Sequence, residues 1–591
     1  MEEKQYNTLA EVLAAYDMAS YRFEYHDLVG ALCALSDGER AKPESHHEWT
    51  AFMLQPNDQD NTFGGYFGPH WTHVDQQGNP YYTPAKEDIT LDAVLYWEQR
   101  YKVANNALMR MRYAALVWDF KRRICNAKYD ADLYRTYVDS MLEVANNDFS
   151  SHPVVTALVL ERLFSIAKNN LEDLTKTKAA LCAFEKRHAT DSSIRYWACQ
   201  FQLMRDNKKF FTQSEIDALV ASHEARLLRL QQPNANGKID VWTLDAQANL
   251  LADFYNRSQQ RDEVSRVLKV AEQAHKQSFD SGNPLQRMGI LEQLHHKYVH
   301  YGLHEDANAL LTEIQEAGVQ ASQTLQKHGY EYTIPQEVYE QADVLFGTKA
   351  ASDEERWQNF VFQFIPSKDN AEKSLAEMAK QAPLYYMTGT NLMDYKGRPM
   401  SVIGSYEQDP EGNLVMHITE HLNFGTTFLG IAIRKMREVG LMTTDRIMSD
   451  IIEPCPLYEG YSYTVIRQAL DFLFGDMPVV ACHLLVPQIE AAIRNLVENA
   501  GYSVIKQQNK KSVEKGFQLI TLDDLLRKEL VEQVFTPDGA LYLRLVLTDQ
   551  RSLNIRNDLC HGILPPDNFH SGVAARLLHV LVMIGMVRIK E

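Results

Sequence analysis

The chain has 591 residues, of which 45% are hydrophobic and 10% aromatic. At roughly 150 residues per domain, this length predicts three or four domains, and the composition excludes a mainly disordered protein. The 60 Lys and Arg residues against 78 Asp and Glu give a net charge of -18, which opposes nonspecific adhesion to nucleic acid, so any RNA-binding site must be a local basic patch.

The cysteine pattern and the apolar runs indicate a cytoplasmic protein with no membrane partner. Seven scattered cysteines without a Cys-x-x-Cys pair are typical of reduced thiols. The first residues lack the basic and apolar regions of a secretory signal. The longest apolar run, residues 577–587, contains His579 and is too short to span a bilayer, so we expect a core helix there.

The predicted fold class is mainly α: a multi-domain helical array with a small α+β middle segment and a C-terminal helical bundle. Residues 1–235 have helical apolar spacing and form the first predicted domain. Within it, residues 36–88 are rich in proline, glycine and aromatic residues, which predicts a long irregular insert. Its histidines lack the cysteine or acidic partners of a metal site.

Residues 236–345 contain an internal repeat. Tyr255 aligns with Tyr298 and Leu268 with Leu311, each pair 43 residues apart. A helix, a short polar turn and a second helix at this period resemble tetratricopeptide-like α-solenoids, which bind protein partners. With two clear copies, a general helical array explains the pattern equally well.

Residues 346–462 are the predicted α+β connecting domain. Two β-prone runs flank a turn rich in Asp, Pro, Gly and Asn, which predicts a hairpin over residues 401–419. Residues 428–439 have the spacing of an amphipathic helix with a modest basic face. The last predicted domain, residues 463–591, follows this segment.

The most informative stretch is residues 552–566, SLNIRNDLCHGILPP. Gly562 and the prolines after it form a helix-stop signal, so residues 556–561 should be the last turns of a helix. Asn557 and His561 then lie one turn apart on one face, where the amide can orient the imidazole. Arg556 offers a planar charged group that matches phosphate oxygens.

These residue types form a minimal set for cleaving RNA. His561 would transfer protons, Arg556 would stabilise the phosphate, and Asn557 would position the imidazole. Asp558 would raise the pKa of His561. Because the ribose 2′-hydroxyl would be the nucleophile, no metal and no cofactor are expected. The alternative is that Arg556 and Asn557 cap neighbouring carbonyls beside a structural histidine.

The motif Arg-Asn-x-x-x-His resembles the signature of the HEPN superfamily (higher eukaryotes and prokaryotes nucleotide-binding). With the following glycine it resembles a bacterial domain of uncharacterised function named for this motif. The resemblance extends upstream through residues 484–496, 500–501 and 519–526. It implies a HEPN-like helical bundle in which a first long helix and a connecting segment precede the motif helix.

The resemblance also implies activity. Family members that cut RNA do so as homodimers and leave 2′,3′-cyclic phosphates, and many are toxins or effectors in bacterial defence. Other members have lost catalysis and bind nucleotides or proteins. The resemblance therefore implies two functions: an endoribonuclease, or a non-catalytic helical scaffold. Metal-dependent hydrolysis is disfavoured because no ligand cluster is present.

Further candidate residues lie upstream of the motif. His483, Glu490 and Arg494 share one stripe of a predicted helix that faces either solvent or the motif. If the stripe points inward, Glu490 can orient His561 and Arg494 can add a phosphate contact. The connecting segment is basic and either attracts RNA or is a solvated loop. Its candidate RNA-binding residues are Lys506, Lys510, Lys511 and Lys515.

Overall fold

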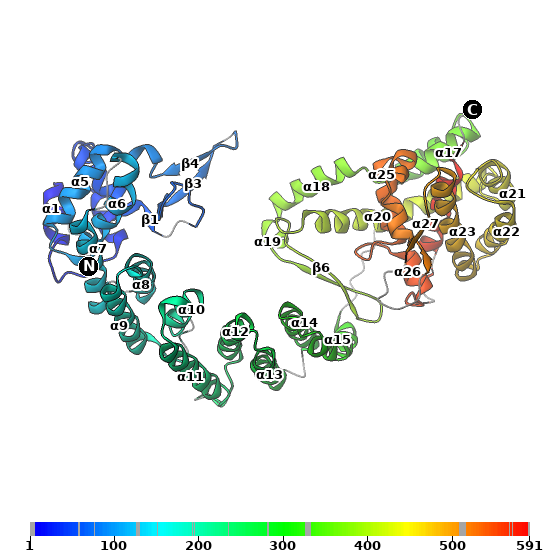
Figure 1. Cartoon of the computed structure of the whole chain (residues 1–591). Coiled ribbons are helices and arrows are strands. Elements are labelled where there is room, and N and C mark those ends of the chain that lie inside the picture. Colours follow the sequence, from blue (N-terminus) through cyan, green and yellow to red (C-terminus); the bar gives the residue numbers. More distant parts are fainter. Residues whose placement is uncertain are drawn as a thin grey trace. The chain divides into compact units, whose positions relative to one another are not determined.

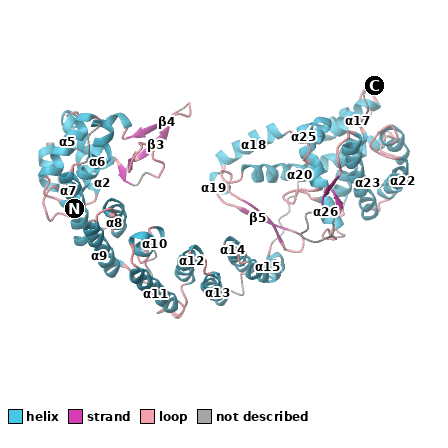
Figure 2. Cartoon of the chain, viewed as in Figure 1, coloured by secondary structure: helices cyan, strands magenta, loops and turns pink. Residues whose placement is uncertain are grey.

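The computed structural model describes the chain except residues 1–5, 57–58, 76, 126–129, 150–151, 192, 194–195, 235, 280–282, 326–332, 508–515, 566–567, 570 and 589–591. Helices predominate, and in the described ranges strands form only two-stranded pairs (Figure 2), which confirms the mainly α fold class. Backbone contacts divide the chain into two compact units, residues 1–278 and residues 279–591 (Figure 1). Within the described ranges, no helix is both long enough and apolar enough to cross a bilayer.

The elements of the first unit follow one another in the order shown in Figure 1. They are α1 Leu9–Tyr16, α2 Tyr25–Cys33, α3 Asp37–Arg40, α4 Pro43–Met53, β1 Gln55–Pro56, β2 Phe67–Gly68, β3 Trp71–Val74, β4 Pro80–Thr83, η1 Lys86–Asp88, α5 Leu91–Val103, α6 Ala107–Cys125, α7 Ala131–Asn147, α8 Pro153–Ala167, α9 Leu171–His188, α10 Cys199–Asp206, η2 Lys208–Phe210, α11 Gln213–Leu230, α12 Val241–Arg257 and α13 Arg261–Gln277.

The second unit contains the remaining elements. They are α14 Pro284–His300, α15 His304–Thr324, α16 Gln336–Phe346, α17 Asp353–Phe362, α18 Lys368–Gln381, α19 Pro383–Tyr386, β5 Thr390–Met393, β6 Pro399–Ile403, α20 Pro410–Glu438, α21 Thr444–Ile447, the π-helix η3 Met448–Ile452, α22 Gly460–Phe474, α23 Pro478–Asn499, β7 Ile505–Gln507, β8 Phe517–Leu519, α24 Leu522–Leu526, α25 Glu529–Leu547, α26 Ile555–Cys560 and α27 Ser571–Gly585.

The predicted irregular insert, residues 36–88, is in part helical. Helix α4 starts with Pro43 at its first position, where the missing N–H costs no hydrogen bond. The helix is an integral part of the core, because Glu48 is fully buried and accepts hydrogen bonds from Tyr96, Tyr113 and Arg100. A buried carboxylate with three donors looks like a surface residue in a hydropathy pattern, which explains why the helix was not predicted.

The internal repeat has a structural counterpart. Helices α12 and α13 form one helical hairpin and α14 and α15 another, and both pairs are in close contact. The turns match: Gln259 and Gly302 both have positive φ, 58° and 70°. In the first turn the Gln260 N–H donates to the Tyr255 carbonyl at 3.0 Å, and in the second turn the Leu303 N–H donates to the Tyr298 carbonyl at 2.8 Å. The two copies therefore share one helix-turn-helix geometry.

The predicted hairpin over residues 401–419 is wrong in register and in its second strand. The hairpin pairs β5 with β6, and residues 410–438 form the single helix α20. The Asp409 side chain accepts a hydrogen bond from the Gly412 N–H at 2.8 Å, and Pro410 occupies the first turn. Asp-Pro-Glu-Gly is therefore a helix N-cap rather than a hairpin turn. The helix predicted over residues 428–439 is present as the end of α20, which stops at Glu438 with Val439 as its C-cap.

The core of the second unit is built around α27. This helix contacts α17, α20 and α23, and residues 577–584 are buried along its whole circumference, which confirms the predicted core helix. The motif helix α26 lies between α25 and α27 in the chain and contacts α25. The motif is therefore held at the edge of the apolar core.

Candidate active site

The motif occupies the short helix α26. Ile555 and Leu559 are buried and anchor it, whereas Arg556 is half-buried and His561 is exposed. The helix ends at Cys560 with His561 as its C-cap, one residue earlier than predicted, and the glycine stop is confirmed: Gly562 has a φ of 62° and its N–H donates to the Leu559 carbonyl at 3.1 Å. The next N–H, five residues after Asp558, donates to the Asp558 carbonyl at 2.8 Å, which completes a Schellman motif.

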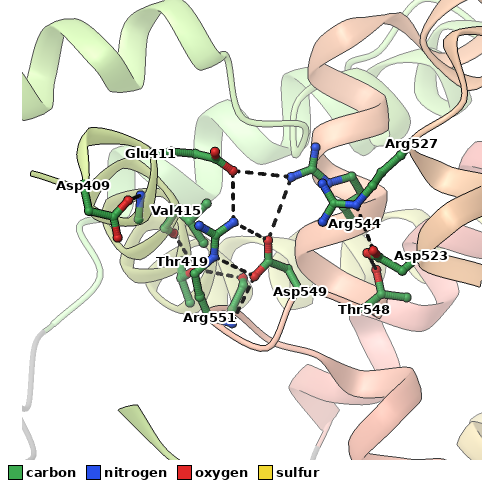
Figure 3. A network of polar contacts seen from close by, with 12 residues as sticks. Asp409, Glu411, Val415, Thr419, Asp523, Arg527, Arg544, Thr548, Asp549 and Arg551 are labelled. Atoms are coloured by element: carbon green, nitrogen blue, oxygen red, sulfur yellow. Dashed lines mark hydrogen bonds and ion pairs between the residues drawn. The ribbon is translucent and has the colours of Figure 1, made fainter. Parts of the chain in front are cut away.

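Ion pairs fix the loop that leads into the motif helix (Figure 3). Arg551 contacts Asp549 at 2.9 Å and Glu411, at the start of α20, at 3.0 Å. The Thr548 hydroxyl donates to the Asp523 carboxylate at the start of α24, at 2.9 Å. Burial alone would raise the pKa of Asp549, but the hydrogen bonds and charge of Arg551 lower it on balance. The loop is therefore tied to two helices before α26 begins.

Asn557 connects this loop to the motif arginine. Its Nδ2 donates to the Thr548 carbonyl at 3.2 Å and to Asn554 Oδ1 at 2.8 Å. Its Oδ1 accepts a hydrogen bond from Arg556 Nη1 at 2.9 Å. Among the described residues, no hydrogen bond joins its amide to the His561 ring. Asn557 therefore positions Arg556 and the loop. The prediction that it positions the His561 imidazole does not fit these hydrogen bonds.

Arg556 belongs to a chain of charges that crosses to α23. Its Nε donates to Glu490 Oε2 at 3.0 Å, and Arg494 Nη2 donates to Glu490 Oε1 at 2.9 Å. Arg494 Nη1 also donates to the Ile520 carbonyl at 3.1 Å. The inward alternative for this part of the stripe thus fits the structure, but Glu490 binds Arg556 and not His561. Two arginines share one carboxylate, so the cluster has a net positive charge.

Asp558 lies on the other side of the helix. Its Oδ1 accepts a hydrogen bond from Asn554 Nδ2 at 2.8 Å. Burial raises the pKa of the Asp558 carboxyl, which outweighs the lowering by the Asn554 hydrogen bond and by the charges of His561 and Arg398. Asp394 adds a further raising contribution. Asp558 and His561 are thus close enough to interact electrostatically.

The other predicted residues are dispersed. His483 is exposed, its Nδ1 donates to the Val479 carbonyl at 2.8 Å, and its ring stacks on Phe569 at 5.4 Å. Lys506, on β7, pairs with Asp524 at 2.7 Å and lowers the pKa of that carboxyl. The remaining three, Lys510, Lys511 and Lys515, lie outside the described residues.

A cavity of about 360 Å³ adjoins the motif helix. Its lining includes Asp394 in the β5–β6 turn, Asn423 on α20, Asn554 and Asp558 at the motif, and Arg576 on α27. Sequence reasoning missed Asp394, Asn554 and Arg576. Only Asn554 carried a local signal, as a polar residue directly before a helix. The other two reach the motif through tertiary packing alone.

The polar cluster around α26 is thus a set of half-buried charges beside an exposed imidazole, and its described residues include no group of three or more potential metal ligands. No family model matches the chain, and comparisons with curated proteins and with solved structures found no match.

Proposed function

We propose that residues 463–591 form a metal-independent endoribonuclease, with His561 as general acid and base and Arg556 as the phosphate-binding cation. One observation carries the proposal: the short motif helix presents an exposed His561 at its end and a half-buried Arg556 that a carboxylate and an amide hold in place. An exposed imidazole and a held cation are the two groups that phosphodiester transfer requires.

In the proposed reaction, His561 removes the proton of a ribose 2′-hydroxyl. The 2′-oxygen forms a bond to phosphorus, the bond to the 5′-oxygen breaks, and the leaving 5′-oxygen receives the proton back from the His561 imidazolium. Arg556 stabilises the charge that develops on the phosphate. The products are a 2′,3′-cyclic phosphate and a 5′-hydroxyl, which balances atoms and protons without a metal.

The proposal includes a homodimer, because Arg556 is turned towards Glu490 and away from the imidazole of its own chain. An arginine supplied by a second copy would complete each site. It also includes a cellular role as a toxin or effector in bacterial defence, with a cytoplasmic location and with a protein partner bound by either of the helical hairpins α12–α13 and α14–α15.

A second candidate function is a non-catalytic scaffold that binds a protein or a nucleotide. The supporting observation is that the Asn557 amide is fully used in internal hydrogen bonds and that Arg556 is already ion-paired. Such a cluster is stable without a substrate. It would then stabilise the end of α25 and the start of α26 and take no part in catalysis.

Cleavage of tRNA and total RNA in EDTA distinguishes the two functions. We expect cleavage by the wild type, 2′,3′-cyclic phosphate ends, and a loss of at least about 100-fold in rate for His561→Ala. His483→Ala is the matched control, because its exposed imidazole lies on α23 and should leave the rate unchanged. Equal rates for wild type and His561→Ala, or no cleavage by a verified dimer with either RNA, would favour the scaffold.

A further inference from the structure

Arg576, on the core helix α27, is a buried cation without an anionic partner. Its side chain lies in the core, with 2% of the residue surface exposed. Nη2 donates to the Leu422 carbonyl of α20 at 2.5 Å, whereas Nε and Nη1 have no hydrogen-bond partner. Within the described residues, no carboxylate lies within ion-pair distance of it. Burying a charge in this way is costly unless a counter-ion is present.

The groups around the guanidinium do not neutralise it. His579 Nε2 donates to the Phe360 and Val361 carbonyls, so its Nδ1 accepts from the Tyr542 hydroxyl at 2.8 Å. Burial, together with the charge of Arg576, lowers the pKa of His579 to about 3, so this ring is neutral at pH 7. Burial raises the pKa of Tyr542 by more than the nearby Arg576 guanidinium lowers it, so this phenol is neutral as well.

Arg576 lines two cavities, and carboxylates are present in the lining of only one of them. The first is the cavity beside the motif, which contains Asp394 and Asp558. Asp394 is paired with Arg398 at 2.5 Å, and Asp558 is bonded to Asn554. The second cavity, which we call the Arg576 cavity, has a volume of about 380 Å³ and no carboxylate in its lining. An anion that approaches Arg576 therefore fits this second cavity better.

The lining of the Arg576 cavity offers further hydrogen-bond donors. Ser367, the N-cap of the 14-residue helix α18, lines it together with Asn370 in the first turn, so the positive end of the helix dipole lies at the cavity. The other polar groups of the lining are the amide of Gln363, the imidazole of His421 and the hydroxyl of Ser374, which is hydrogen-bonded to His417 Nε2 at 3.2 Å. The carboxylate at this helix end, Asp538, accepts from the Lys368 N–H and does not line the cavity.

We propose that the Arg576 cavity binds the phosphate group of a small organic phosphate. A guanidinium with neutral polar groups around it, and with no carboxylate in the lining to compete, suits the three oxygens of a phosphate monoester. An apolar wall that includes Phe364 would contact the organic part, and the volume falls within the range of small-molecule sites. This site is independent of the proposed nuclease chemistry, since it uses neither Arg556 nor His561.

Thermal unfolding and calorimetric titration of the full chain test this site with three probes: phenyl phosphate, inorganic phosphate and benzoate. We expect phenyl phosphate to bind more tightly than inorganic phosphate and to raise the unfolding temperature by about 3 °C at roughly 100 times its Kd. Benzoate should bind at least about 10-fold more weakly than phenyl phosphate. Binding of benzoate as tight as that of phenyl phosphate, or no shift with any probe, would overturn the proposal.

Two variants separate binding from a structural role. Arg576→Met should abolish the shift and, without ligand, should unfold at a temperature no lower than that of the wild type, because it removes an unpaired buried charge. If that variant does not fold, Gly425→Val serves instead: a Cβ there lies 3.4 Å from Arg576 Nη2 and reduces the space, so binding should weaken at least about 10-fold. Arg467→Met, an exposed arginine paired with Asp445, is the matched charge control. A full shift in Arg576→Met, or in a folded Gly425→Val, would contradict the assignment.

Discussion

Replacing Asn557 with alanine tests the role that the structure gives this amide. Three hydrogen bonds are lost, to Thr548, Asn554 and Arg556. At about 1 kcal/mol net for each bond, the free energy of unfolding should fall by about 2–3 kcal/mol, because the carbonyl of the buried Thr548 and the half-buried Arg556 lose their partners. The matched control is Asn495→Ala, which loses the hydrogen bond from Nδ2 to the Leu457 carbonyl at 2.9 Å and should lower the free energy of unfolding by about 1 kcal/mol.

Urea unfolding followed by 19F NMR of 5-fluorotryptophan gives the measurement. Trp357 is the one tryptophan of residues 279–591, and it is 4% exposed, so its signal reports unfolding of this unit. In the double variant with Asn554→Ala, the losses should be smaller than additive, since the two amides bond to each other. A cost for Asn557→Ala no larger than that for Asn495→Ala would refute the reasoning.

Three further changes are measured with the same probe unless stated otherwise. Gly562→Ala should cost about 1 kcal/mol because of its φ of 62°, whereas Gly430→Ala, inside α20 with open space around it, should stabilise by about 0.5–1 kcal/mol. A change of the same sign in the free energy of unfolding for both variants would contradict the assigned role of the positive φ at Gly562. Glu490→Gln should cost about 1–3 kcal/mol because it leaves two half-buried arginines without their carboxylate, and a cost near zero would show that the pair is only a solvated contact. For His579, the folded pKa of about 3 lies below the unfolded value of 6.5, so the unfolded chain binds more protons than the folded chain between these two values. The free energy of unfolding therefore falls as the pH decreases below about 6.5, by about 1.4 kcal/mol per pH unit. 15N NMR of the imidazole at pH 5 should show a neutral ring with the proton on Nε2, and a charged ring would contradict this.

Local signals in the sequence predicted much of the fold. Helical spacing predicted the helices, the 43-residue period predicted two matching helix-turn-helix units, and Gly562 predicted the end of the motif helix. Each of these depends on interactions within about one turn or one hairpin, so the residues involved are neighbours in the chain. The prediction of a hairpin over residues 401–419 was wrong because its second β-prone run is also compatible with a helix, and the N-cap at Asp409 stabilises the start of that helix.

The sequence by itself determined that Arg556, Asn557 and His561 lie on the last turns of one helix, because backbone geometry and a glycine stop depend on adjacent residues alone. Tertiary structure decided what those side chains contact. Glu490 reaches Arg556 from a helix 66 positions away in the chain, and Arg576 meets a cavity that α18, α20 and α27 form together. Such contacts depend on how helices pack, and packing is set by the whole core rather than by any local pattern.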